Sequence, residues 1–402
     1  MSNKVIPYGR QNITQEDIDS VIKTLKSDYL TQGPKIAEFE EAFAKYVDSK
    51  YAVAVSNGTA ALHLCALAMN VQEGDKVITT PITFAASANC VRYAGGEVVF
   101  ADIDPDTYLL DINNVKELLE NAPKGTYKGI IPVDFAGRAV DLEAFRKLAD
   151  EYGLWIIEDA CHAPGGYFKD SEGKKQYCGN GNFADLAIFS FHPVKHIASG
   201  EGGMITTNDK DLYDRLMKLR THGITKNEAE YKNSIEFATG TTAMSSEVET
   251  YPAWYMEMQE LGYNYRITDF QAALGNSQLN RAGEGLQRRQ EIAKIYSQAF
   301  ADKDFVQGLS GDLEGHAYHL FILQVKDRLG LYDFLREKGI YAQIHYIPCH
   351  LMPYYRDLGW KEGDMPQAEN YYKECISLPV YPTLTNEDQE YVIRTINAFY
   401  EN

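Results

Sequence analysis

The clearest structural signal in the chain lies in residues 154–162, whose sequence is LWIIEDACH. Four apolar residues are followed at once by two acids, and a histidine comes three residues after the second acid. An apolar run that does not alternate with polar residues predicts a strand buried on both faces. Because ligands bind beyond the carboxyl ends of such strands, Asp159 and His162 are candidate site residues. Taken alone, however, the segment favours a simpler interpretation, in which Asp159 caps the next helix and His162 is structural.

Similar apolar runs recur through the first half of the chain and alternate with stretches of helical spacing. The runs cover residues 51–55, 77–80, 98–102, 129–133, 154–157, 186–189 and 204–207. The helical stretches include residues 58–69, 84–93, 115–119, 142–152 and 212–219. This alternation predicts an α/β fold, in which a mainly parallel, seven-stranded sheet lies between helices.

The rest of the chain suggests a second, smaller domain. A helical region from Thr268 to about Phe300 leads into a strand at residues 320–325, a helix at 331–338 and a closing helix after Thr385. We therefore expect a large domain at residues 1–260, and a long linking helix with a small C-terminal α+β domain at 261–402.

Between Thr225 and Met258 the alternation of strands and helices stops. An irregular segment of this length inside a compact protein is either a functional lid or disordered, and the sequence does not separate the two. We treat residues 225–258 as an insert in the large domain.

Composition restricts the class of protein further. The chain has 402 residues, 24% of them charged, and a formal net charge of -18, which argues against nucleic acid or an anionic membrane as a partner. The first five residues show no targeting signal, and no apolar run is long enough to span a membrane, so we expect a cytoplasmic protein. Six cysteines without a Cys-x-x-Cys pair indicate reduced, mostly buried thiols rather than a metal site.

A lysine stands in an unusual place after another expected strand. Residues 189–195 have the sequence FSFHPVK, and the glycine-rich segment GEGG follows at 200–203. Most lysines are solvated at the surface, but Lys195 lies in an uncharged loop beside glycines that permit close backbone approach. A pocket that excludes water would lower the pKa of such a lysine, so that its neutral amine could attack a carbonyl.

A candidate phosphate site lies where the first strand of the sheet passes into a helix. Residues 55–62 have the sequence VSNGTAAL, and the free N–H groups of a helix start can bind phosphate. Thr59 and Ser190 could add hydroxyl donors. The segment matches neither Gly-x-Gly-x-x-Gly nor the P-loop pattern, which argues against a nucleotide-dependent oxidoreductase.

These features occur together in a specific order: a glycine-led helix at Gly58, Phe84 after a strand, Asp159 at a strand end, and Lys195 after Ser190. In this order the chain resembles the DegT/DnrJ family of sugar aminotransferases, which use pyridoxal phosphate (PLP) and have fold type I. The resemblance covers nearly the whole chain and includes the segments LTQGP at 30–34, GYNYR at 262–266 and HYIP at 345–348.

The resemblance implies a role for each candidate residue. Lys195 is similar to the lysine that forms a Schiff base with PLP, and Asp159 to the carboxylate that keeps the pyridine nitrogen protonated, so that the ring can act as an electron sink. His162 is similar to the partner of the phenolic oxygen, and Phe84 to the ring that stacks on the cofactor. The phosphate would be held by Gly58, Thr59, Ala60 and Ser190. Asn264 resembles a residue that reaches the phosphate from the neighbouring subunit, which implies a homodimer with shared active sites.

Within the family, residues 30–33, 134–138 and 191–195 are most similar to the aminotransferases of pseudaminic acid biosynthesis. Those enzymes aminate C4 of a UDP-linked 4-keto-6-deoxy-N-acetylhexosamine, and L-glutamate is the expected amino donor. Candidates for contacting the UDP group are Thr31, Gln32, Gly33, Arg138 and His345. For each of these an ordinary structural role is an equally good explanation.

Three alternatives remain open besides this substrate. The enzyme could aminate a different nucleotide-linked 3- or 4-keto sugar. It could be a PLP-dependent sugar dehydratase, although such relatives carry histidine where this chain has Lys195. A regulatory protein that binds the cofactor without catalysis would be expected to lack Lys195 or Asp159, and both are present.

Overall fold

A seven-stranded sheet forms the centre of the protein. The structure is a computed structural model that describes residues 5–240 and 250–401. The strands lie in the order β2 (Tyr51–Val55), β10 (Gly203–Thr207), β9 (Leu186–Ser190), β6 (Trp155–Asp159), β5 (Tyr127–Ile131), β3 (Lys76–Thr79) and β4 (Glu97–Phe100). Strand β10 is antiparallel to both of its neighbours, and all other pairs are parallel. The predicted, mainly parallel sheet of an α/β fold is therefore confirmed.

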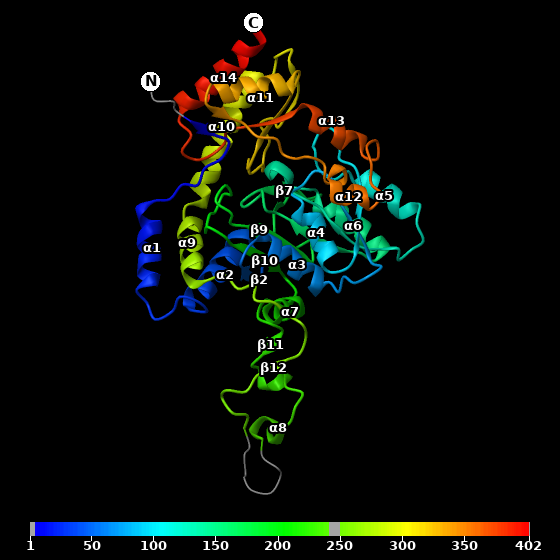
Figure 1. The fold of residues 1–402 in the computed structure, drawn as a ribbon, viewed down its shortest axis with the longest axis vertical. Coiled ribbons are helices and arrows are strands. Elements are labelled where there is room, and N and C mark those ends of the chain that lie inside the picture. Colours follow the sequence, from blue (N-terminus) through cyan, green and yellow to red (C-terminus); the bar gives the residue numbers. More distant parts are fainter. Residues whose placement is uncertain (1–4, 241–249, 402) are drawn as a thin grey trace.

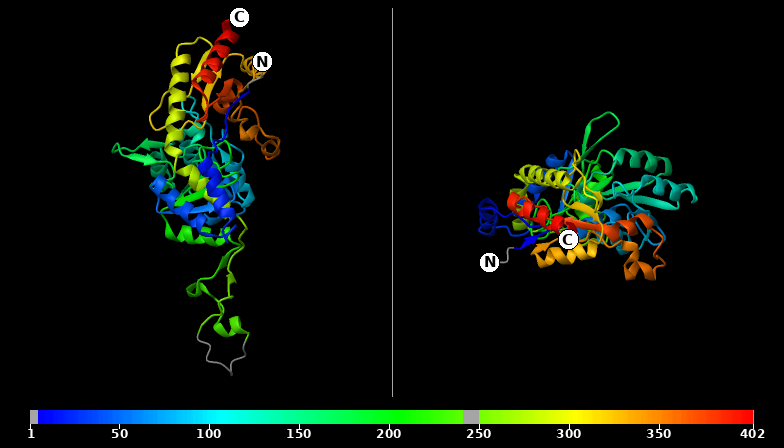
Figure 2. Two further views of the ribbon diagram at one scale, coloured as in Figure 1. Left: turned by 90° about the vertical axis from the view of Figure 1, so that its left-hand side faces the viewer. Right: turned by 90° about the horizontal axis from the view of Figure 1, so that it is seen from above.

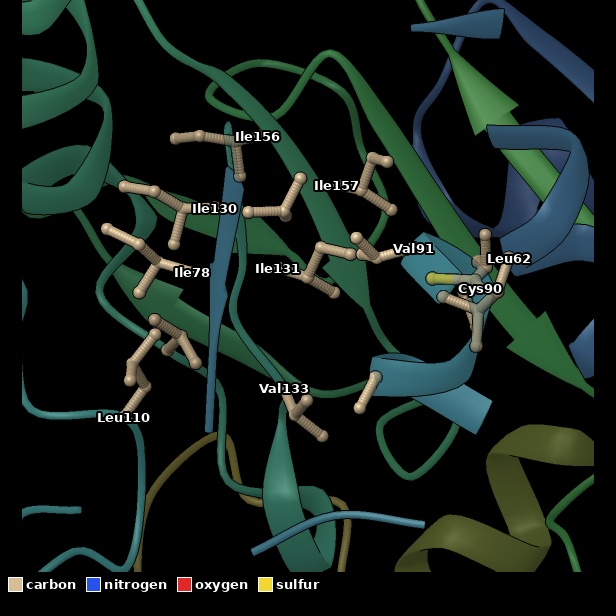
Figure 3. Packing of buried hydrophobic residues seen from close by; sticks show 14 of the residues in the cluster. Leu62, Ile78, Cys90, Val91, Leu110, Ile130, Ile131, Val133, Ile156 and Ile157 are labelled. Carbon is tan, nitrogen blue, oxygen red and sulfur yellow. The ribbon is translucent and has the colours of Figure 1, made fainter. Parts of the chain in front are cut away.

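Helices cover both faces of this sheet, so its central strands are fully buried. Ile156 and Ile157 are adjacent in β6 and face opposite sides, yet neither is exposed; Figure 3 shows them among other buried side chains. Burying an isoleucine completely contributes about 1.5–3 kcal/mol, so a continuous apolar strand is stable only between two apolar layers. The covering helices are α3 (Gly58–Ala68), α4 (Ala86–Tyr93), α5 (Ile112–Glu120), α6 (Leu142–Tyr152) and α7 (Lys210–Arg220).

A second apolar core lies in the C-terminal part of the chain (Figure 1). An antiparallel sheet of β13 (Val306–Leu309), β14 (Phe321–Val325) and β16 (Cys375–Leu378) packs there with α11 (Arg328–Glu337) and α14 (Asn386–Glu401). Strand β1 (Ile6–Pro7) pairs in parallel with β15 (Ile340–Tyr341), so the start of the described chain is attached to this smaller α+β unit. The expected domain boundary at residue 260 stays a prediction.

Smaller elements complete the fold. The hairpin β7 (Tyr167–Lys169) and β8 (Lys175–Tyr177) projects from the body, as the side view in Figure 2 shows. Helices α12 (Pro353–Asp357) and α13 (Pro366–Glu374), with the short 3₁₀ turns η1 (Phe135–Gly137) and η3 (Cys349–Leu351), lie near the carboxyl-terminal side of the main sheet.

The helical region expected at residues 268–300 is divided into α9 (Asp269–Leu279) and α10 (Ala282–Phe300). Helix α9 packs against α1 (Gln15–Leu25) and α2 (Pro34–Val47), whereas α10 belongs to the C-terminal core. At the junction Arg281 leaves the helical conformation with φ of -121°, and its guanidinium pairs with the buried carboxylate of Asp17. The break therefore coincides with a contact between distant segments, which helical periodicity does not reveal.

The insert at residues 225–258 forms most of an arm that projects from the body beyond α7 (Figures 1 and 2). At its base β11 (Ile224–Thr225) pairs with β12 (Glu257–Met258), and η2 (Glu228–Glu230) and α8 (Ile235–Thr239) follow outward. The sequence from Ala238 to Ser246 is small and polar, and residues 241–246 of it lie outside the described residues. The described part of the arm leaves Phe237, Trp254 and Met258 about two-thirds exposed.

The sequence also makes predictions about membrane-spanning helices and about the burial of the cysteines. Among residues 5–240 and 250–401, no helix combines the length and the apolar character needed to cross a membrane. Five of the six cysteines are buried, as expected.

Candidate active site

A cavity of about 610 Å³ lies where β6 and β9 end, and it gathers most of the predicted site residues. Asp159 is the last residue of β6 and Ser190 the last of β9, so the sheet itself places both at the edge of the cavity. The predicted residues that line it are Gly58, Thr59, Ala60, Phe84, Asp159, His162, Ser190, Lys195 and His345.

Asp159 is buried and is held by donors from two directions. The hydroxyl of Ser87 in α4 donates to its carboxylate at 2.6 Å, and the backbone N–H of Cys161 donates at 3.2 Å. A buried carboxylate needs such donors to offset its lost hydration. These two hydrogen bonds fix the orientation of the carboxylate at the edge of the cavity.

Lys195 lies in the loop after β9, where its backbone N–H donates to the carbonyl of His192 at 2.8 Å. Burial lowers the pKa of Lys195, and the nearby guanidinium of Arg289 adds to this effect. The Cys161 thiol and the Asp159 carboxylate act in the opposite direction without cancelling it. A lowered pKa makes the neutral, nucleophilic amine easier to reach near neutral pH.

His162 is a neutral hydrogen-bond donor in this cavity. Burial and the nearby Lys195 hold the pKa of His162 well below its usual value. Its Nδ1 accepts the backbone N–H of Ala136 at 3.3 Å, so the remaining proton is assigned to Nε2, which lies 3.3 Å from the hydroxyl oxygen of Tyr346. The ring of His319 lies against it, with centroids 4.2 Å apart.

The first turn of α3 lies beside the end of β9 and presents backbone donors to the cavity. A Cβ atom at Gly58 would lie 3.0 Å from the Cβ of Ser190, so glycine permits this close approach. Asn57 caps the helix by accepting the N–H of Ala60. The other N–H groups of the first turn, with the hydroxyls of Thr59 and Ser190, form a donor set suited to phosphate.

Together these residues fit PLP. An amine, a buried carboxylate and a helix start are the groups that its aldehyde, ring nitrogen and phosphate would need. Phe84 is 63% exposed although it lines the cavity, so a large aromatic face is available to a planar ligand.

Several predicted residues lie outside this cavity. Asn264 forms a backbone bridge with Thr221 near the base of the arm. Thr31 bridges to Thr268, and Gly33 caps α2 where a Cβ atom would collide with Asp269. Gln32 lies between them, and Arg138 lines a separate cavity of about 280 Å³. Of the residues suggested for UDP, the structure brings only His345 to the main cavity.

Some lining residues carry little signal in the sequence. Ser87 is one small polar residue in an expected helix, and His319 precedes an expected strand without any pattern around it. Tyr346 lies in the segment HYIP beside His345, and this was the only signal that could have identified it.

The fold and the cavity define a PLP-dependent transferase of fold type I. Comparison with known proteins identifies the family: the profile of the DegT/DnrJ/EryC1/StrS aminotransferase family matches residues 11–397. The chain belongs to this family. It is therefore a PLP-dependent aminotransferase, as the sequence predicted, and similar solved structures include a PLP form.

Individual relatives are similar along their full length. The chain is 38% identical over 403 residues to the spore coat polysaccharide biosynthesis protein SpsC of Bacillus subtilis, covering 98% of this chain and 97% of that one. It is 34% identical over 403 residues to a UDP-4-amino-4,6-dideoxy-N-acetyl-beta-L-altrosamine transaminase of Campylobacter jejuni, covering 99% and 98%. Helicobacter pylori PseC, an aminotransferase of pseudoaminic acid biosynthesis, superimposes with a TM-score of 0.85 at 29% identity, covering 99% and 100%.

Proposed function

We propose that this enzyme transfers an amino group from L-glutamate to C4 of a UDP-linked 4-keto-6-deoxy-N-acetylhexosamine. The observation that carries the proposal is the full-length similarity to an altrosamine transaminase, together with a cavity that holds Lys195, Asp159 and His162. The fold similarity to PseC supports the same substrate class.

In this proposal Lys195 has two tasks. Its amine would hold the cofactor through the aldehyde. As a free amine it would take a proton from the substrate carbon that bears nitrogen and later return a proton, as general base and general acid. The lowered pKa of Lys195 suits both tasks, because the neutral amine is the form that attacks and accepts a proton.

The other residues hold and tune the cofactor. PLP supplies an electron sink that stabilises negative charge on a substrate carbon. Asp159 would keep a proton on the ring nitrogen, and Nε2–H of His162 would donate to the phenolic oxygen. Gly58, Thr59 and Ser190 would bind the phosphate, Ala60 would line its site while its own N–H is held by Asn57, and Phe84 would stack on the ring.

We also propose that the enzyme works as a homodimer in which Asn264 completes the partner's phosphate site. Asn264 lies near the base of the arm rather than in its own chain's cavity, which is compatible with a role in a neighbouring subunit. Large apolar side chains exposed on the arm are compatible with contacts to a second copy.

The substrate is tested by mass spectrometry of products from a panel of UDP- and dTDP-linked keto sugars incubated with glutamate. We expect one amino sugar from the UDP-linked 4-keto sugar. Lys195→Ala should give no product, and it should also lack the visible absorption that borohydride removes from the wild type. Failure with every 4-keto sugar would defeat the substrate assignment alone. Near wild-type turnover by Lys195→Ala would refute the role of the lysine.

A second candidate has a specific basis. The chain is more similar to SpsC, at 38% identity, than to the altrosamine transaminase, at 34%. A different nucleotide-linked 3- or 4-keto sugar, one that serves polysaccharide synthesis, is therefore the alternative acceptor. The same panel separates the two, because it identifies both the nucleotide and the position that is aminated.

A further inference from the structure

A second cavity of about 230 Å³ adjoins the active-site cavity, and Lys195 is the one lining residue that the two share. It lies between the N-terminal segment and the first turns of α10. Arg10, Arg281, Arg288 and Arg289 line it, against a single acid, Glu284. We call it the basic cavity.

Arg289 is the most unusual of these cations. It is 1% exposed, and one of its terminal nitrogens donates to the backbone carbonyls of Tyr318, His319 and Val380. Its Nε has no partner, and no carboxylate lies within 4 Å of it in the part of the chain that the structure describes. Burial lowers the pKa of Arg289 to about 10. A buried cation without a counter-ion is costly, and an anion in the adjoining cavity would offset that cost.

The other arginines differ in how far their charges are already matched. Arg281 pairs with Asp17, and Arg288 pairs with Glu291 at 3.2 Å. Arg10 is exposed and makes no side-chain hydrogen bond or ion pair within residues 5–240 and 250–401. Arg10 and Arg289 therefore leave the basic cavity with unmatched positive charge, even after Glu284 is counted.

The active-site cavity lacks such charge. Among the described residues that line it, Lys195 is the only lysine or arginine, whereas Asp159 and Glu201 are acids. The proposed function nevertheless requires a dicarboxylate donor and a substrate with a diphosphate. The cations that could attract these anions line the basic cavity, beyond Lys195.

We propose that the basic cavity is a binding subsite for a substrate oxyanion, a carboxylate or a phosphate, with Arg10 and Arg289 as its cationic ligands. Its volume suits one such group rather than a whole nucleotide sugar. The identification of the anion as part of a substrate rests on the proposed function, but the binding of an oxyanion does not. A bound anion would also reduce the repulsion between Arg289 and Lys195, which couples the subsite to the reactive amine.

Binding is tested by thermal unfolding of the holoenzyme with 2-oxoglutarate or inorganic phosphate. We expect either anion to raise the Tm of the wild type by a few degrees at saturation, and to raise that of Arg10→Gln by less than half as much. Arg356→Gln removes an exposed arginine on α12, away from both cavities, and should respond as the wild type does. Equal stabilisation of the wild type and Arg10→Gln, or none in either, would overturn the proposal.

The source of the anion is tested by measuring the two half-reactions separately. Arg10→Gln should raise the KM of one substrate about tenfold, with kcat nearly unchanged, because an exposed cation that binds a remote group contributes to binding rather than to the chemical step. A change confined to glutamate identifies the donor carboxylate, and one confined to the nucleotide sugar identifies the diphosphate. Unchanged KM values for both would exclude a substrate. If the wild type aminates no nucleotide sugar, the proposed function fails while the Tm result still decides whether the subsite exists.

Discussion

The hydroxyl of Ser87 holds the carboxylate of Asp159 at 2.6 Å, and this contact has a measurable consequence. A hydrogen bond to a buried charged group contributes about 1.5–3 kcal/mol, so Ser87→Ala should weaken PLP binding by about 10- to 100-fold if Asp159 holds the ring nitrogen. Titration of the apoenzyme with PLP, followed by absorbance, measures the affinity. Ser171→Ala, which removes a serine that bonds Glu143 at the surface, is the matched control. An unchanged affinity in Ser87→Ala would argue that Asp159 is not the ring partner.

Tyr346 contacts His162 from the C-terminal part of the chain. Burial raises the pKa of Tyr346, so its hydroxyl stays protonated at neutral pH. Tyr346→Phe keeps the ring but removes the hydroxyl 3.3 Å from Nε2 of His162, a contact that helps the Ala136 N–H to orient the imidazole in the cavity. We expect kcat to fall about tenfold or more, with a Tm close to that of the wild type. Tyr391→Phe, at an exposed tyrosine of α14, should change neither quantity, and normal kcat in Tyr346→Phe would show that His162 needs no second partner.

Local sequence was a good guide wherever an element is stabilised by its own pattern. The apolar runs predicted every strand of the main sheet, because burial on both faces requires a continuous apolar strand. The start of α1 is equally local, because the Asp17 carboxylate accepts the backbone N–H of Thr14 at 2.9 Å. Helical periodicity did not predict the division between α9 and α10, where Arg281 pairs with Asp17, more than 260 residues earlier in the chain.

This junction allows a prediction about stability. Burial alone would raise the pKa of Asp17, but hydrogen bonds from Thr14, Ser277 and Arg281 outweigh it and keep the pKa below its usual value. Asp17→Asn should therefore lower the free energy of unfolding by about 2–3 kcal/mol, since Arg281 would lose its buried counter-ion. Urea denaturation measures the difference. Asp19→Asn, on the same helix but facing Gln15 at the surface, should change it by less than about 0.5 kcal/mol, and equal effects would contradict this account.

The whole molecule should lose stability on mild acidification. Burial lowers the pKa of five histidines in the interior, to about 3 for His316 and His345; the others are His162, His196 and His319. Below the unfolded value of about 6.5 the unfolded chain binds more protons, so this contribution to stability is lost as pH falls toward the folded values.

Two buried carboxyls act in the opposite sense. Burial raises the pKa of Asp134 to about 6, and burial with the neighbouring Asp134 raises that of Glu158. Their contribution to stability is present below the unfolded pKa of about 4, and it is lost as pH rises through their pKa values in the folded protein. Because the histidines outnumber these carboxyls, we expect the free energy of unfolding to fall between pH 6.5 and 5. The expected slope is about 1.4 kcal/mol per pH unit for each proton that the unfolded chain binds in excess of the folded one. Tm against pH measures it. Removing the exposed His222 by His222→Asn should leave the slope unchanged, and a flat profile would contradict the assignment.

The candidate site was predictable only in part, and the reason is its assembly from the whole molecule. Asp159 and Ser190 lie at strand ends, and Lys195 follows one closely, so the sheet alone brings them together. Tyr346 and His319 reach the same cavity from the C-terminal part, and no local pattern indicates where that part docks. Arg138 is the opposite case. It follows the end of β5, yet it lines a separate cavity rather than the main one.

The proposed homodimer predicts that active sites can be rebuilt from two defective chains. Lys195→Ala should remove the reactive amine from a chain's own cavity, whereas Asn264→Ala should impair only the cavity of its partner. Each homodimer then has two defective sites, but a heterodimer of the two variants has one site with both residues intact and one with neither. If the two variants are unfolded together and refolded as an equal mixture, half of the dimers are heterodimers, and about a quarter of the wild-type activity should return. Mixing Lys195→Ala with Asp159→Ala is the control, because both residues belong to one cavity and neither site of that heterodimer is intact. Equal recovery in both mixtures, or none in either, would place Asn264 outside the partner's site.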